Sequence, residues 1–273
     1  MKKSSVFAPV LAVCLLAAGC GSQTENTGST AAKAAAPVQT AETAAAVTEA
    51  PAPAAAESVT AAEPSPEWVA QLPEAATSDQ LFVVAGVGET TAYVSMHQKN
   101  EKGEWEQLLT TPGYIGKKGL GKTKEGDGKT PVGTYHFNFA FGIADDPGCA
   151  IEYHKATDDS YWSGDPREGF RYNQYVDIKD LPELDTNECE HIYDYYVHYQ
   201  YCLNISYNEE GTPGLGSAIF LHCLGPQKPY TGGCVAIPQD KMVKVMQNVR
   251  EDCAVVIGSL KDISGSTWEE WGL

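Results

Sequence analysis

The clearest chemistry-bearing residues of this chain are a histidine and a cysteine twelve positions apart. His222 ends an apolar run that begins at Ser217, and Cys234 directly follows Gly232 and Gly233. A thiolate that is stabilised by an imidazolium or by backbone N–H groups is a strong nucleophile. Glycines let the backbone approach a substrate carbonyl closely, and nearby N–H groups can then hold its oxyanion. The spacing predicts Cys234 as a nucleophile and His222 as its base, with the thiol pKa held well below that of free cysteine.

The elements that must position this pair are mainly strands. Short segments rich in β-branched and aromatic residues, bounded by Gly, Asn, Pro or Asp, predict strands at 81–87, 91–97, 105–110, 133–141, 175–178, 201–207, 217–222 and 253–258. Apolar residues at helical spacing predict one clear helix, on Met242, Val245, Met246 and Val249. Segments 73–80 and 181–190 are weaker helix candidates. Repeated short strands with one or two helices predict a mainly β domain, a sandwich or a barrel-like fold.

The amino terminus has the pattern of an export signal. Lys2 and Lys3 precede an apolar run that is too short to span a bilayer comfortably. The run ends in Leu-Ala-Ala-Gly-Cys at residues 16–20, which resembles a bacterial lipobox, although Ala17 stands where leucine is more usual. We therefore expect a lipoprotein signal at 1–19, lipidation of Cys20 and a protein held at the membrane in the extracytoplasmic cell envelope. An ordinary secretory signal is the alternative.

Composition divides the rest of the chain. Residues 20–79 are dominated by Ala, Thr, Glu, Ser and Pro, which predicts a disordered tether after the anchor. Residues 80–260 are long enough for one catalytic domain with its own core, and 261–273 form a C-terminal tail. The net charge of −17 argues against nucleic acid as a partner.

Several segments together resemble the YkuD-type L,D-transpeptidase catalytic domain. That family carries His-x(n)-[Ser/Thr]-x-Gly-Cys, and His222, Thr231, Gly233 and Cys234 fill this pattern. Lys-Thr-Pro-Val-Gly-Thr-Tyr at 129–135 is similar to its recurrent T-P-x-G-x-[FY] element. The resemblance spans about 81–258, nearly the whole domain.

This resemblance implies a function and a set of roles. Family members take a tetrapeptide stem of peptidoglycan, form an acyl-enzyme on the cysteine with loss of the terminal D-Ala, and transfer the acyl group to a side-chain amine. They use no metal cofactor. The backbone carbonyl of Cys223 is expected to orient His222. Thr231 and Gly233 are expected to shape the turn and the oxyanion site, and Tyr161, Trp162 and Gly232 to contact substrate.

The sequence departs from the family pattern in three ways. The His–Cys gap is shorter than in the commonest members, Gly232 replaces a frequent second histidine, and Ala236 stands where many members have arginine. These departures leave open the donor and acceptor stems. A thiol hydrolase of the L,D-carboxypeptidase type shares the acylation step, and a non-catalytic wall-binding lipoprotein is a further alternative.

The remaining cysteines of the domain are a separate question. A metal site is the rival interpretation, but no Cys-x-x-Cys or His-Glu-x-x-His spacing supports it. Its possible ligands are Cys189, Glu190, His191, Cys202, His222, Cys223 and Cys234. Disulfides or buried thiols explain these cysteines more simply. The pairing of five of them is not determined by the sequence: Cys149, Cys189, Cys202, Cys223 and Cys253.

Overall fold

The computed structural model describes residues 63–265 except Gln227. The expected signal, the lipidation site Cys20 and most of the predicted tether lie outside these residues. Within the described part, no helix combines the length and the apolar character that crossing a membrane requires.

The core of the domain is a sheet that closes on itself. Its strands are β2 (Gln80–Gly86), β3 (Thr91–Lys99), β4 (Trp105–Tyr114), β5 (Gly133–Gly142), β10 (Cys202–Ile205), β11 (Phe220–Cys223), β12 (Val235–Ile237) and β13 (Cys253–Ser259). The strand order is β4-β12-β11-β10-β5-β13-β2-β3, and β3 pairs with β4 to complete the ring. The β11–β12 and β13–β2 pairs are parallel, and the other pairs of the ring are antiparallel. The prediction of a mainly β, barrel-like domain is confirmed.

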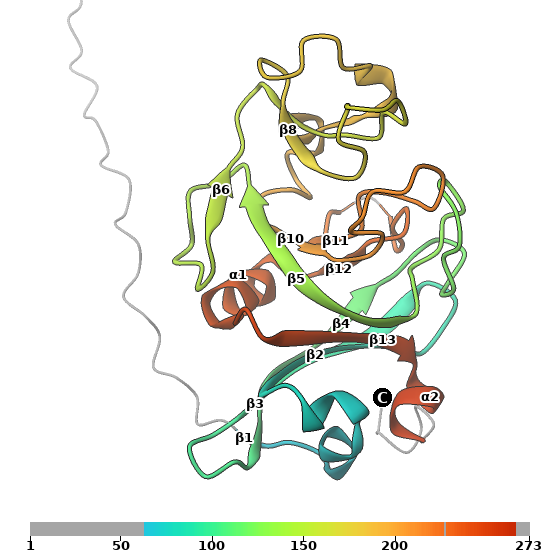
Figure 1. Ribbon diagram of the computed structural model, residues 1–273. Coiled ribbons are helices and arrows are strands. Elements are labelled where there is room, and N and C mark those ends of the chain that lie inside the picture. The colour runs from blue at the N-terminus through green and yellow to red at the C-terminus, as the bar shows by residue number, and fades with distance from the viewer. Residues whose placement is uncertain (1–62, 227, 266–273) are drawn as a thin grey trace, which may run out of the picture. The chain divides into compact units, whose positions relative to one another are not determined.

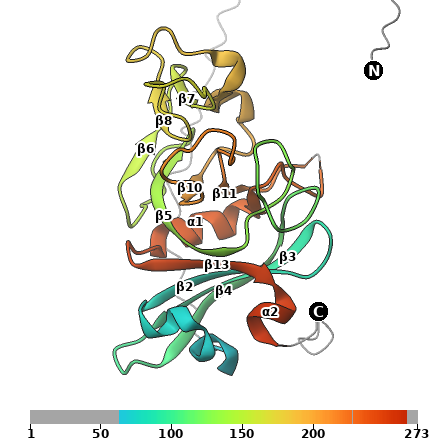
Figure 2. The ribbon, with the colours of Figure 1, turned by 45° about the vertical axis from the view of Figure 1, so that its right-hand side comes forward.

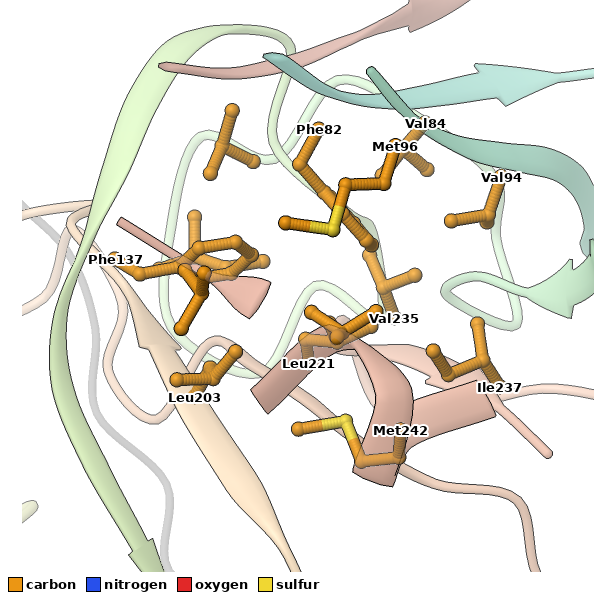
Figure 3. Packing of buried hydrophobic residues seen from close by; sticks show 14 of the residues in the cluster. Phe82, Val84, Val94, Met96, Phe137, Leu203, Leu221, Val235, Ile237 and Met242 are labelled. Atoms are coloured by element: carbon orange, nitrogen blue, oxygen red, sulfur yellow. The ribbon is translucent and has the colours of Figure 1, made fainter. Parts of the chain in front are cut away.

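The interior of this ring is packed with apolar side chains (Figure 3). Phe82 and Met96 from β2 and β3 meet Phe137 from β5 and Leu221 from β11 in one buried cluster. The apolar face of α1 (Gln239–Asn248) completes the cluster, as the 242–249 spacing predicted. Burying such side chains contributes about 1.5–3 kcal/mol each, so this cluster holds β11 and β12 rigidly.

Smaller elements surround the ring (Figures 1 and 2). The remaining strands are β1 (Glu63–Pro64), β6 (Tyr153–Lys155), β7 (Ser160–Trp162), β8 (Tyr175–Asp177) and β9 (Glu190–His191). The remaining helices are α2 (Leu260–Ser264) and the 3₁₀ turns η1 (Glu67–Gln71), η2 (Pro73–Ala76), η3 (Thr186–Glu188) and η4 (Ile192–Tyr195). Strands β8, β7 and β9 form a separate three-stranded sheet. The helix expected at 181–190 is therefore wrong, because only η3 is helical there and β9 begins at Glu190.

The folded domain begins earlier than the predicted boundary at residue 80. Strand β1 pairs with β4, and Val69, Leu72 and Ala75 pack on the outer face of the sheet against Leu81 and Val83. The prediction of a disordered tether over all of 20–79 is therefore corrected at 63–79, which form ordered structure. The prediction fails there because it rests on the average composition of 20–79, which does not reflect the few apolar residues near its end. At the other end, α2 extends into the expected tail with Leu260 buried.

A buried histidine links this amino-terminal segment to the sheet. The His97 ring is fully buried, with Nδ1 2.8 Å from Ser65 Oγ and Nε2 2.8 Å from Ser95 Oγ. Trp68 packs edge-on against it at 5.7 Å between ring centroids. Burial lowers the pKa of His97 from 6.5 to about 4. The imidazole is therefore neutral in the folded protein near neutral pH.

We expect His97 to make the domain acid-sensitive. Protons bind the unfolded chain more tightly than the folded one, so the free energy of unfolding falls below pH 6.5 and levels off below about pH 4. As the pH falls from about 7.5 to about 5, this one group removes about 2 kcal/mol. Urea unfolding at the two pH values measures the decrease in the free energy of unfolding. In His97→Gln this decrease should be smaller by about 2 kcal/mol. An unchanged pH dependence in this variant would contradict the assignment.

Candidate active site

The sheet register brings His222 and Cys234 to one cavity. Strands β11 and β12 are parallel neighbours with His222 opposite Ala236, and Cys234 immediately precedes β12. Side chains alternate along a strand, so Phe220 and His222 share the face of β11 that is turned away from Leu221 and the main core. His222 and Cys234 both line a cavity of about 550 Å³. The structure thus joins the two residues that the sequence pairs.

The Cys234 thiol is buried and held by backbone groups. Only 8% of the residue is exposed. Its Sγ donates to the carbonyl of Ala218 at 3.1 Å and accepts from the Phe220 N–H at 3.4 Å. Ala218 itself has φ of +54°, a conformation that non-glycine residues rarely adopt and that is concentrated at functional sites.

The His222 ring is fixed by its own strand. Its Nδ1 lies 2.9 Å from the carbonyl oxygen of Cys223. A carbonyl can only accept, so Nδ1 carries the hydrogen and Nε2 keeps its lone pair in the neutral ring. This is the orienting contact that the resemblance implied for Cys223. The Cys223 thiol is turned to the opposite side, in the main core.

The electrostatics favour a neutral thiol and a neutral imidazole. Burial lowers the pKa of His222 to about 4, against a smaller raising effect from its bond to Cys223 and with a further lowering by His198. Burial raises the pKa of the Cys234 thiol to about 12; Glu190 raises it further, and the Phe220 N–H and Lys122 lower it. This differs from the expectation of a depressed thiol pKa, because desolvation outweighs the stabilising contacts.

The turn before Cys234 is a network of short hydrogen bonds. Thr231 Oγ1 donates to the carbonyl of Cys234 at 2.6 Å and accepts from the Gly233 N–H at 3.1 Å. Thr130 Oγ1 donates to the carbonyl of Gly233 at 2.8 Å and accepts from the Gly116 N–H at 2.9 Å. Gly233 has φ of +151°, and a Cβ there would lie 2.8 Å from a backbone oxygen. Thr231 and Gly233, for which the resemblance implies a role in shaping the turn, both take part in these hydrogen bonds. The Gly233 N–H is used within the turn and not aimed at a substrate oxyanion.

Two residues expected to bind substrate do not line the cavity. Trp162 is buried, stacks on Phe141, and donates from Nε1 to Asn173 Oδ1 at 3.0 Å. The same Asn173 oxygen accepts from the Ala218 N–H, which links Trp162 to the carbonyl that holds the thiol. Tyr161 stacks on the His191 ring outside the cavity lining. Trp162 therefore supports the site from behind. Gly232 does line the cavity, and a Cβ there would meet no atom within 4 Å.

Several cavity residues are not among the residues predicted for the site. Glu190 and Tyr199 approach from the segment around η4, and Lys117, Lys122 and Glu125 come from the loop after β4. The Lys122 ammonium is buried and paired with Asp127 at 3.2 Å. The sequence singles out Glu190 only as a neighbour of Cys189 and His191 in the rival metal interpretation. Residues 63–265, without Gln227, place no three His, Cys, Asp or Glu side chains together as metal ligands.

The other cysteines are thiols in this structure. All six in the described part of the chain are free, and Cys202, Cys223 and Cys253 are buried with Cys234. Burial raises the pKa of Cys223 to about 12. Cys234 has an equally raised pKa, so what sets it apart from these thiols is the cavity that it shares with His222.

Comparison with known proteins gives a family match. A model of the L,D-transpeptidase catalytic domain, YkuD, matches residues 80–257. No curated protein gives a significant match. Two solved structures of the helical cell shape determining protein Pgp2 from Campylobacter jejuni, one of them a point mutant, are 16% identical, with a TM-score of 0.36. The match covers 70% of this chain and 53% or 54% of Pgp2, so it spans about half the length of that protein. The family match covers more than half of the chain, and the chain therefore belongs to the YkuD family of L,D-transpeptidase catalytic domains.

Proposed function

We propose that the protein is a peptidoglycan L,D-transpeptidase that forms an acyl-enzyme on Cys234. The observation that supports this most directly is the shared cavity of the Cys234 thiol and the His222 ring, with Nε2 of His222 left as the acceptor. A neutral imidazole beside a neutral thiol is suited to take the thiol proton during attack.

Acylation forms a carbon–sulfur bond and then breaks the carbon–nitrogen bond to the terminal D-Ala. The thiol turns from the Ala218 carbonyl toward His222, and its proton passes to Nε2 as Sγ attacks the carbonyl that precedes the terminal D-Ala. Backbone N–H groups of the turn other than that of Gly233 hold the oxyanion. The carbon–nitrogen bond then breaks, the D-Ala amine takes the proton from His222, and a thioester remains on Cys234.

Transfer reverses these proton movements. The amine of a second stem attacks the thioester and gives its proton to Nε2. The carbon–sulfur bond breaks, the new amide leaves, and the imidazolium returns the proton to Sγ. In the hydrolytic alternative water replaces the amine, so the product is a tripeptide rather than a cross-linked dimer.

Product analysis tests this proposal. The purified protein is incubated with tetrapeptide muropeptides, with and without an added amine acceptor, and products are identified by mass. Release of D-Ala together with a cross-linked dimer is the expected result. Tripeptide alone would replace transfer with hydrolysis, and no D-Ala release from any tetrapeptide would refute the enzymatic proposal.

We also propose that Cys20 carries a lipid that holds the protein at the extracytoplasmic face of a membrane. The proposal rests on the segment 16–21, which lies outside the described residues. Cys20→Ala should move the protein from the membrane fraction to the soluble envelope or extracellular fraction, as judged by immunoblotting. Membrane association equal to that of the parent would contradict lipidation at this residue.

A further inference from the structure

A carboxylate of unassigned purpose faces the candidate active site. Glu190 lies on β9 of the three-stranded sheet, opposite Trp162 of β7, and it lines the same cavity as Cys234. The Tyr199 hydroxyl donates to Glu190 Oε2 at 2.6 Å. Among the ion pairs of residues 63–265, none engages Glu190, although lysines line other parts of this cavity.

The surroundings of Glu190 do not compensate a negative charge. Burial raises its pKa to about 7, the Tyr199 bond lowers it, and Glu125 raises it further. In return, a charge on Glu190 raises the pKa of four groups, which lie on η4, on the segment after it, on β10 and just before β12: Tyr195, Tyr199, Cys202 and Cys234. A glutamine would hold the Tyr199 hydroxyl equally well at no electrostatic cost. The ionised carboxylate therefore has a cost, which protonation near pH 7 or a cation from outside the chain offsets.

The proposed reaction defines what that cation is. Donor and acceptor stems both contain a residue with a side-chain amine, because the acyl group is transferred to such an amine. An amine that remains an ammonium ion on Glu190 has no lone pair for attack, and on this ground we assign it to the donor rather than to the acceptor. The cavity of about 550 Å³ has room for a peptide segment that places its carbonyl at Cys234 and a side chain toward Glu190.

We propose that Glu190 is a specificity-determining residue that binds the protonated side-chain amine of the donor peptide, beside the carbonyl that Cys234 attacks. This assignment rests on the proposed transpeptidase function and names the group of the donor that the site selects. The ammonium supplies the missing positive charge, and Tyr199 holds the carboxylate in place for it.

Binding of the amine also acts on the nucleophile. Ionised Glu190 raises the pKa of the Cys234 thiol, so it opposes formation of the thiolate in the free protein. A bound ammonium neutralises that charge and removes the repulsion. The correct donor therefore makes Cys234 more reactive, whereas a donor without the amine leaves the repulsion in place.

The test compares two donor peptides that differ in one group. One is a stem tetrapeptide with a free side-chain amine, and the other is the same peptide acetylated on that amine. Acylation of Cys234 is followed in the full chain for the parent, Glu190→Gln and the control Glu188→Gln. Glu188 is exposed, lies two residues earlier and is absent from the cavity lining.

The expected result is a loss of discrimination in Glu190→Gln. A buried charged hydrogen bond is worth about 1.5–3 kcal/mol, so kcat/KM for the free-amine peptide should fall by about 10- to 100-fold, mainly through KM. The acetylated peptide should react at the parental rate or faster, because glutamine removes the charge that raises the pKa of Cys234. Glu188→Gln should match the parent with both peptides. An equal loss with both peptides would overturn the inference, because it would assign Glu190 to the support of Tyr199 alone.

The pH dependence provides a second readout. Since the pKa of Glu190 lies at about 7, KM for the free-amine peptide should rise as the pH falls below 7, and KM for the acetylated peptide should not. Tyr199→Phe removes a contact that lowers the pKa of Glu190, so it should move this midpoint upward while discrimination is kept. If Glu190→Gln does not fold, Glu190→Asp retains the charge and should retain discrimination.

Failure of the proposed function gives a different pattern. If neither peptide acylates the parent, binding of both peptides to full-length Cys234→Ala is measured by calorimetry, with and without Glu190→Gln. Tighter binding of the free-amine peptide that depends on Glu190 would support the inference without catalysis. Equal binding of the two peptides would overturn it.

Discussion

Replacement of Cys234 by alanine or serine is expected to abolish acyl-enzyme formation and to lower turnover by about 10⁴-fold or more, because no other described thiol faces the cavity. The fold should remain, since alanine removes only the sulfur atom and serine replaces it with oxygen. Intact mass after incubation with tetrapeptide should show an acyl adduct on the parent and none on the variants.

A carbapenem, whose strained β-lactam carbonyl acylates nucleophiles, gives an independent probe of the same residue. One adduct is expected, on the peptide that contains Cys234. Cys189→Ala is a suitable control, because this half-buried thiol lies outside the cavity lining. An adduct on Cys223 would contradict the assignment of the nucleophile.

His222→Ala is expected to lower acylation by about 10²- to 10⁴-fold, the usual contribution of a positioned general base. Because the pKa of His222 is lowered to about 4, the base is unprotonated throughout the neutral range. Activity toward the acetylated donor peptide should therefore persist as the pH falls to about 5 and be lost only near pH 4. Single-turnover acylation against pH measures both effects, with the exposed His136→Ala as a control.

The rate of thiol alkylation in the free protein distinguishes a neutral Cys234–His222 pair from a preformed thiolate–imidazolium pair. With the pKa of Cys234 raised to about 12, alkylation at pH 7 should be slow in the parent and similarly slow in His222→Ala. A low thiol pKa in the parent that His222→Ala abolishes would instead establish a preformed thiolate–imidazolium pair. The neutral pair assigned here would then be wrong.

The sequence predicts that His222 and Cys234 share a site because the determinants of their placement are local. His222 ends a strand and Cys234 precedes the next one, so two short segments carry both side chains and the glycines of the turn. The strand pattern likewise depends on neighbouring residues, and the mainly β fold follows from it. The order of segment 63–79 is not predicted, because the alanine-rich composition of 20–79 outweighs a few apolar residues such as Val69 and Leu72. The importance of these residues becomes evident only from the sheet surface that they cover.

The electrostatics of the site could not be predicted in the same way. Burial of Cys234 and the placement of Glu190 depend on segments that come together only in three dimensions. The sequence therefore predicts a lowered pKa for the Cys234 thiol, whereas burial in the structure raises it. Trp162 is a similar case, because its link through Asn173 to Ala218 is formed between distant loops.

The closed sheet also bears on how copies of this protein behave when they are crowded. Every strand of the ring has a neighbour on both sides, so the ring presents fewer unpaired N–H and C=O groups to a strand of another molecule than an open sheet edge would. The shortest pairing in the ring is between β12 and β4, where Ala236 pairs with Tyr114. It lies beside the turn that precedes Cys234. The bridge between Gly116 and Thr231 and the Thr130 hydroxyl reinforce that seam. The hydrogen bonds that position Cys234 therefore also help to close the sheet against strand exchange and aggregation.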